Sequence, residues 1–367
     1  MMKQIHSNYS LPFDNLRRFW LFGFLLLLCR CCEGIVKLPE NMTIPAVFAF
    51  GDSIVDQGNN NKLKTAIYCN FVPYGKDFQG GIPTGRFSNG KTPPDIIAEE
   101  LGIKDLIQAY QDPNLTVHDL PTGVSFASGG CGYDPQTSNL MSVTPLSSQV
   151  EQFKEYIGKL KAAVGEDTTN QILRNAMHLV VAGSDDLANT YFTIGIRRLQ
   201  YDVNSYADFL VDSASIFIQD LYKLGARRIA VFSIPPIGCV PFQRTLAGGS
   251  TRRCADSYNQ AAQLVNGKMK PQLDLLTQSL AESRVVYIDV YKPFLDLIQH
   301  PSNYGFEVND KGCCGTGNIE VTMLCNKYSR ICGNVSEYIF WDSYHPTERA
   351  YRVLVKDVII NYIESFV

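Results

Sequence analysis

The chain has 367 residues, which is enough for one large α/β domain or two small ones. Hydrophobic residues make up 45% of it and charged residues 19%, so it can bury a sizeable core. The formal net charge of −3 and the lack of a basic run argue against nucleic acid or an anionic membrane surface as the main partner.

The N-terminal segment has the pattern of a secretory signal peptide. Two arginines precede an almost entirely apolar run at residues 19–28, and small or cysteine residues follow it up to Gly34. The apolar run is too short for a transmembrane helix, which needs about 20 residues. We therefore expect residues 1–34 to be a signal peptide and residues 35–367 to form a single domain without a membrane span. A signal anchor is the alternative.

Eight cysteines follow this segment, and an even number of cysteines in a secreted chain indicates disulfides. They are Cys69 and Cys131, which stand apart, and two local groups, Cys239 with Cys254, and Cys313/Cys314 with Cys325/Cys332. The two local groups are the expected pairings. A zinc site in the last group is disfavoured, because the group has no paired C-x-x-C spacing.

Three Asn-x-Ser/Thr sequons predict N-glycosylation, at Asn41, Asn114 and Asn334. Such sites are used only in exported proteins, so they agree with the signal peptide and the cysteines. Together these features predict a secreted protein.

Five short apolar runs alternate with helical patterns along the chain. We expect strands at residues 45–50, 123–128, 177–182, 228–233 and 285–290. We expect helices at residues 93–101, 146–163, 201–224 and 254–280, and a last helix that Pro346 opens. This alternation predicts a parallel sheet covered by helices on both faces. Residues 57–92 have loop composition, and so long a loop in a compact domain is usually functional.

A serine follows the first expected strand directly. Gly51, Asp52 and Ser53 stand where the apolar run meets a polar loop, and in open α/β sheets the chemistry lies just beyond the carboxyl ends of the strands. A hydroxyl placed there is free to act as a nucleophile, and the serine N–H is free to donate to a developing oxyanion. A plain turn is the structural alternative.

An acid and a base stand near the other end of the chain. Asp342 and His345 are three residues apart, so the carboxylate can reach one imidazole nitrogen while the other nitrogen faces a serine. The remaining histidines are His6 ahead of the signal core, His178 in an apolar strand where we expect a core residue, and His118 and His300 in loops where we expect surface residues. The sequence therefore predicts a Ser53–His345–Asp342 triad.

No cofactor motif competes with this triad. The chain has no G-x-S-x-G elbow, no Walker P-loop, no H-E-x-x-H and no dinucleotide fingerprint. The glycines at 129, 130 and 132 lack the spacing of a phosphate-binding loop and favour an oxyanion turn. We expect neither a cofactor nor a metal.

Four motifs recur in order and resemble those of the plant secreted GDSL esterases/lipases of the SGNH hydrolase superfamily, close to the extracellular lipase group. Residues 50–53 resemble the first block of that family, residues 123–130 the second, residues 183–186 the third and residues 342–346 the last. The resemblance runs from Phe48 to the last helix. It implies a three-layer α/β/α, flavodoxin-like fold with a five-stranded parallel sheet. It also implies hydrolysis of acyl esters of lipids, sugars or phenolics in the cell wall or apoplast.

The resemblance also implies a role for each matched residue. Ser53 would be the nucleophile, His345 the base and Asp342 the acid. The backbone N–H groups of Ser53 and Gly130 would bind the oxyanion, together with a side chain at position 185.

Position 185 departs from the family pattern, which usually has asparagine there and at Ser125. An ionised Asp185 has no proton to donate and repels an oxyanion, and the loss of one donor costs roughly 10²–10³ in rate. A protonated Asp185 still donates, and Asp186 would raise its pKa further if both carboxyls faced the pocket.

This departure leaves three functions open. The first is a secreted serine esterase/lipase, dampened by Asp185. The second is a weakly active or inactive lipid- or glycan-binding protein of the cell wall or pollen surface. The third is an acyltransferase that uses the same triad and prefers an alcohol to water as the acceptor.

Overall fold

The computed structural model describes residues 38–40 and 42–367. The expected signal peptide, residues 1–34, and the sequon residue Asn41 lie outside the described residues. In the part of the chain that is described, no helix is both long and apolar enough to cross a membrane.

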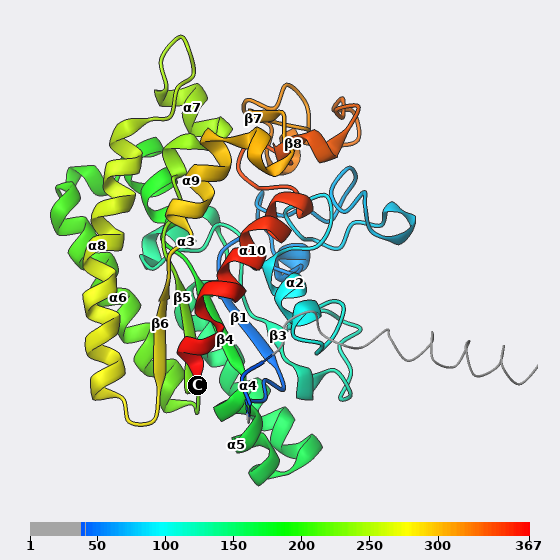
Figure 1. Cartoon of the computed structure of the whole chain (residues 1–367), viewed down its shortest axis with the longest axis vertical. Coiled ribbons are helices and arrows are strands. Elements are labelled where there is room, and N and C mark those ends of the chain that lie inside the picture. Colours follow the sequence, from blue (N-terminus) through cyan, green and yellow to red (C-terminus); the bar gives the residue numbers. More distant parts are fainter. Residues whose placement is uncertain (1–37, 41) are drawn as a thin grey trace, which may run out of the picture.

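A six-stranded sheet forms the centre of the molecule, and all its neighbouring strands are parallel (Figure 1). In the order β2–β3–β1–β4–β5–β6, the strands are Gln108–Ala109, Val124–Ser125, Val47–Gly51, Met177–Val181, Arg228–Phe232 and Arg284–Ile288. The five expected strands are confirmed. The expected strand number is one too low, because β2 has two residues, too few to form a pattern in the sequence.

Helices cover both faces of the sheet, which confirms the three-layer architecture. On one face lie α4 (Leu146–Val164), α6 (Val203–Lys223) and α8 (Asp256–Ser279); on the other lie α2 (Pro93–Glu100) and α10 (Glu348–Tyr362). Successive side chains of a strand point to opposite faces. Phe48 and Phe50 of β1 therefore pack in the first layer, and Val47 and Ala49 pack under α2 and α10. Figure 1 shows α10, coloured red, in front of the sheet with α2 beside it.

The expected final helix is confirmed, and it packs on the sheet. Tyr351, Val355, Val358 and Ile359 are buried against the sheet. The helix begins two residues after Pro346, because Thr347 is its N-cap and accepts a hydrogen bond from the Ala350 N–H. This places His345 in the short segment between a strand and a helix.

Four helices and a second small sheet were not expected from the sequence. They are α3 (Pro135–Met141), α5 (Glu166–Asn175), α7 (Pro241–Ala247) and α9 (Tyr291–Gln299), and the parallel pair β7 (Val308–Gly312) and β8 (Tyr338–Phe340). The small sheet lies beyond α10 in Figure 1. It carries the segment that leads from β8 to Asp342 and His345.

Three disulfides confirm both local cysteine groups. They join Cys239 to Cys254, Cys313 to Cys332 and Cys314 to Cys325. The other two cysteines among the described residues, Cys69 and Cys131, are buried free thiols. The expectation of disulfides from the even number of cysteines is therefore correct only for the two local groups.

Candidate active site

Ser53, His345 and Asp342 lie in one hydrogen-bonded series, although Ser53 and His345 are 292 positions apart. The Ser53 Oγ is 2.8 Å from His345 Nε2. On the other side of the ring, His345 Nδ1 is 2.9 Å from Asp342 Oδ2 and 3.0 Å from Oδ1. The structure thus brings together the three residues that the sequence singled out, with one ring nitrogen facing the hydroxyl and the other facing the carboxylate.

The turn that presents Ser53 requires a glycine at its start. Gly51 has a φ of +126°, and a Cβ there would lie 1.7 Å from the Val181 carbonyl oxygen. The next N–H, that of Asp52, donates to the same Val181 oxygen, and Asp52 Oδ1 accepts from the Ile54 N–H at 3.0 Å. The chain therefore turns away from the sheet between residues 51 and 54, and the half-buried Ser53 stands at the turn.

Asp342 is fully buried, and both of its carboxylate oxygens accept hydrogen bonds. Its Oδ1 accepts from the N–H groups of Tyr344 and His345, at 2.8 and 2.7 Å. Its Oδ2 accepts from the Tyr74 hydroxyl at 2.7 Å. These donors fix the direction of the carboxylate, so it can orient the imidazole.

Tyr74 is a contact of the triad that the sequence did not single out. It lies in the long loop of residues 57–92, is fully buried, and its hydroxyl also accepts from the Thr322 N–H at 2.9 Å. Phe87 of the same loop lies with its ring centroid 5.1 Å from that of His345. The long loop that the sequence marked as functional therefore contributes side chains to the site. The pairing of Tyr74 with Asp342 left no signal in the sequence beyond the need of a buried hydroxyl for a partner.

Two backbone N–H groups near the Ser53 hydroxyl, those of Ser53 and Gly130, are candidates for binding an oxyanion. Gly130 has a φ of +85° and lines a cavity together with Ser53, Asp185 and His345. Among the described residues, neither the Ser53 N–H nor the Gly130 N–H donates to another protein group. The preceding N–H, of Gly129, is held by Asp56 Oδ2 at 2.9 Å, which fixes the turn.

Asp185 lies at the same cavity and is half-buried. It is the N-cap of the π-helix Asp186–Thr193, and its Oδ1 accepts from Asn189 Nδ2 at 2.6 Å. Burial raises the pKa of Asp185 to about 6, although the nearby His345 ring and the Asn189 bond favour its charged form. Its carboxyl therefore changes protonation close to neutral pH.

Asp186 does not share this cavity, so the expected effect of Asp186 on the pKa of Asp185 is wrong. The Asp186 carboxylate accepts hydrogen bonds from the Tyr133 N–H at 2.7 Å and from the Thr137 hydroxyl at 2.5 Å. The carboxyl that is close to Asp185 is that of Asp52, whose pKa is raised well above its usual value by burial and then by Asp185.

The other residues singled out from the sequence make structural contacts or lie at the surface. The Ser125 hydroxyl donates a hydrogen bond to the Val55 carbonyl at 2.6 Å, which stabilises the turn that follows Ser53. His178 is buried in β4 with a pKa lowered to about 4 by burial, and His118 and His300 are exposed, as expected. Asn114 and Asn334 are exposed as well. Within residues 38–40 and 42–367, no group of three or more His, Cys, Asp or Glu side chains is placed to hold a metal ion.

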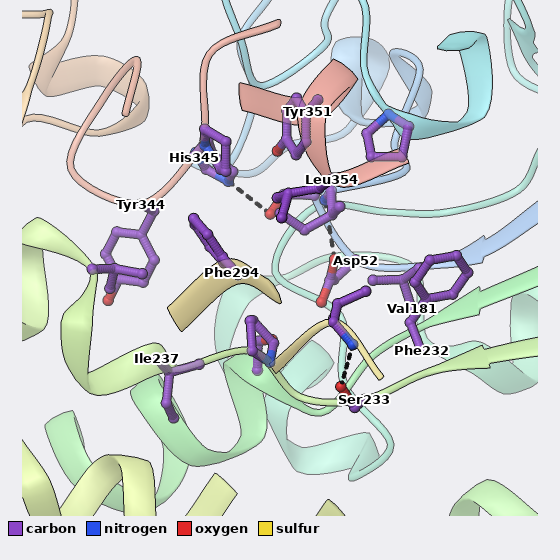
Figure 2. Close-up of a pocket in the computed structure, with 18 of the residues that line it drawn as sticks. Asp52, Val181, Phe232, Ser233, Ile237, Phe294, Tyr344, His345, Tyr351 and Leu354 are labelled. Carbon is purple, nitrogen blue, oxygen red and sulfur yellow. Dashed lines mark hydrogen bonds between the residues drawn. The ribbon is translucent and has the colours of Figure 1, made fainter. Parts of the chain in front are cut away.

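A mostly apolar cavity lies beside Ser53 (Figure 2). Asp52, Asp185 and His345 are among the residues that line it, and its other walls come from the sheet, α9, α10 and the segment after β5. A hydroxyl, an imidazole and a carboxylate in series at the carboxyl edge of a parallel sheet, beside an apolar cavity, form the arrangement of a serine hydrolase.

Comparison with known proteins identifies the family. Residues 47–358 match the model of the GDSL-like Lipase/Acylhydrolase family, and the chain belongs to that family. GDSL esterase/lipase EXL3 of Arabidopsis thaliana is 56% identical over 333 residues, which cover 90% of this chain and 91% of that protein. GDSL esterase/lipase EXL2 of the same plant is 48% identical over 361 residues, 94% of this chain and 95% of that protein. The resemblance inferred from the motifs is confirmed, and the chain is a carboxylic-ester hydrolase.

Proposed function

We propose that the chain is a secreted serine esterase/lipase that cleaves acyl esters through a covalent acyl-enzyme at Ser53. The observation that carries this proposal is the hydrogen-bonded series of Ser53 Oγ, His345 and Asp342, with distances of 2.8 and 2.9 Å. A serine attacks an ester only if a base takes its proton, and an imidazole oriented by a carboxylate is such a base.

The proposed reaction has two steps, the acylation of Ser53 and the hydrolysis of the acyl-enzyme. The Ser53 Oγ attacks the acyl carbon while His345 Nε2 takes the hydroxyl proton, and the N–H groups of Ser53 and Gly130 donate to the oxyanion. His345 then gives the proton to the leaving alcohol oxygen as the ester bond breaks. Water attacks the acyl-enzyme with the same base, and the acid is released.

A fluorophosphonate probe tests the nucleophile. We expect the probe to label the wild-type protein and to leave Ser53→Ala unlabelled, with ester turnover lost by at least about 10³-fold in the variant. Thermal unfolding of Ser53→Ala checks that the variant is folded. Equal labelling of the two proteins would rule out Ser53 as the nucleophile.

Asp185 supports a second candidate function, a binding protein with little turnover. An ionised carboxylate beside the oxyanion position opposes catalysis, and the pKa of about 6 leaves Asp185 mostly ionised at neutral pH. The test is ester turnover by wild type and by Asp185→Asn. Measurable turnover that rises in the variant supports a dampened enzyme, and no Ser53-dependent turnover in either protein supports the binder.

We also propose export to the extracellular space, the cell wall or the apoplast. Three disulfides support this, because they persist in oxidising compartments, and Asn114 and Asn334 are exposed enough to be glycosylated. Expression of the full chain in a plant secretion system tests it. We expect a mature N-terminus near residue 35 and a loss of mass on enzymatic deglycosylation; retention of residues 1–34 in a cell-bound protein would contradict it.

A further inference from the structure

The cavity beside Ser53 has a few polar residues and a larger set of apolar ones. About 110 Å³ of it is open to the centres of water-sized molecules. Its polar lining includes Ser53, Asp52, Asp185, Ser233 and His345, whereas most of the remaining lining is aliphatic or aromatic, with Val181, Phe232, Ile237, Phe294, Leu354 and Val355. In Figure 2, Phe232 and Val181 lie on the opposite side of the cavity from His345 and Tyr344.

A second, smaller apolar hollow continues the same groove between the sheet and α10. Phe232 and Val358 line both spaces. On the sheet side, each residue that lines the second hollow stands two positions before a residue that lines the first. The pairs are Leu179 and Val181, Ala230 and Phe232, and Ile288 and Val290. Residues two apart on a strand share a face, so the two spaces lie in line along the sheet, with Phe232 and Val358 at their boundary.

We infer that the cavity at Ser53 receives the acyl chain of the substrate, and that Phe232 sets the length of chain that fits. The inference rests on the proposed function, because it needs the acyl carbon at Ser53. A flexible hydrocarbon chain matches the apolar walls, and each buried methylene is worth roughly fourfold in affinity. The alcohol part then lies on the other side of Ser53, in a second cavity where Gly130, Asn189 and Thr322 supply polar groups.

The geometry of the sheet gives an approximate chain length. Ser53 follows β1 and Phe232 ends β5, and β4 alone lies between these two strands. Two strand spacings amount to about 10 Å. An extended hydrocarbon advances about 1.25 Å per carbon, since a C–C bond is about 1.5 Å long, so about eight carbons fit between Ser53 and Phe232. Opening the second hollow adds two strand residues, about 7 Å, or about five carbons.

A panel of p-nitrophenyl esters from acetate to palmitate tests the inference on the full-length secreted protein. For wild type we expect kcat/KM to rise up to about the octanoate ester and to fall beyond it. For Phe232→Ala we expect the optimum at the laurate or myristate ester, with the laurate-to-octanoate ratio of kcat/KM raised at least about tenfold. Phe232→Leu removes less volume, so it should shift the chain-length optimum less in the same direction. It replaces Phe232→Ala in the test if the alanine variant does not fold.

Two further variants separate specificity from stability. Leu354→Phe narrows the cavity and should lower turnover of the octanoate ester at least about tenfold while acetate turnover changes little. Phe217→Ala removes a buried phenylalanine from the opposite face of the sheet, so it should lower the melting temperature without moving the optimum. Ser53-dependent turnover with the same chain-length profile in wild type, Phe232→Ala and Leu354→Phe would overturn the inference and leave the proposed function intact. No Ser53-dependent turnover of any ester would overturn both.

Discussion

The acid–base side of the site and its oxyanion side are built on carboxyls in contrasting surroundings. On the acid–base side, Asp342 accepts from two backbone N–H groups, a tyrosine hydroxyl and the imidazole. On the oxyanion side, the single hydrogen bond recorded for Asp185 comes from Asn189, and burial raises the pKa of Asp185 to about 6. The first carboxyl is fixed in one direction by its donors, whereas the second changes its charge near neutral pH.

The two carboxyls therefore differ in what each requires to support catalysis. A buried carboxylate with a full set of donors is a stable orienting group, so the attacking half of the machinery is complete without further change. A carboxyl next to the oxyanion position helps only while it is protonated. The two sides therefore predict opposite outcomes for the same aspartate-to-asparagine substitution.

The largest effect is expected from Asp342→Asn, on the acid–base side. An amide in place of the carboxylate no longer stabilises the correct imidazole tautomer or the imidazolium, so kcat should fall by about 10⁴. Steady-state kinetics on a short-chain ester measures it. Asp296→Asn is the matched control, because Asp296 also lies 2.8 Å from a histidine ring, that of the exposed His300. A loss of the same size in both variants would show that the effect is not specific to the site.

Asp185→Asn, on the oxyanion side, should raise turnover. The asparagine amide donates to the oxyanion and removes a repulsive charge, and one such donor is worth roughly 10²–10³ in kcat. The measurement is kcat at about pH 7.5, where most of the wild-type Asp185 carboxyl is ionised. The adjacent Asp186→Asn is the control, since Asp186 points toward Tyr133 and away from the cavity. Unchanged or lower turnover in Asp185→Asn would show that position 185 does not act on the oxyanion.

The sequence predicted the two ends of the triad because a parallel sheet brings the carboxyl ends of its strands to one edge. Ser53 follows β1, and His345 precedes a helix that packs on the same sheet, so their meeting follows from the topology. The five expected strands were equally visible as apolar runs, although β3 itself has only two residues. β2 was not, because its two residues, one polar and one apolar, form no run.

The sequence could not give the direction in which neighbouring side chains point. Asp185 and Asp186 are adjacent, but they stand at the start of a π-helix, and one faces the cavity while the other faces α3. Nor could it pair Tyr74 with Asp342 across 268 positions. Such contacts depend on the path of loops, which leave no repeating pattern. The pairing within the cysteine group at 313–332 was left open for the same reason.

Tyr74→Phe tests whether the acid–base side depends on its outer donor. The substitution removes the hydroxyl that donates to Asp342 Oδ2 at 2.7 Å and leaves the aromatic packing on Trp341. A hydrogen bond to a charged group is worth about 1.5–3 kcal/mol, so we expect kcat to fall roughly tenfold to a hundredfold with KM nearly unchanged. Tyr133→Phe is the control, because the Tyr133 hydroxyl is buried and has no hydrogen-bond partner among the described residues. A loss of stability with unchanged kcat would assign Tyr74 a structural role only.

The pH dependence of the wild-type enzyme tests the oxyanion side without a substitution. If protonated Asp185 donates to the oxyanion, kcat/KM should rise on the order of tenfold as the pH falls from about 7.5 to about 6, since the neutral fraction of a carboxyl with a pKa of about 6 grows by that amount. The His345 ring favours the charged form of Asp185. Burial raises the pKa of Asp52, Tyr344 and Cys131, and Asp185 in turn raises each of these pKa values further.

The comparison of wild type with Asp185→Asn separates the two sides, because His345 is present in both proteins. Protonation of Asp185 should raise the wild-type kcat/KM relative to that of Asp185→Asn as the pH falls. A ratio of the two kcat/KM values that does not change with pH would mean that turnover proceeds with Asp185 ionised. The two backbone N–H groups would then carry the oxyanion alone.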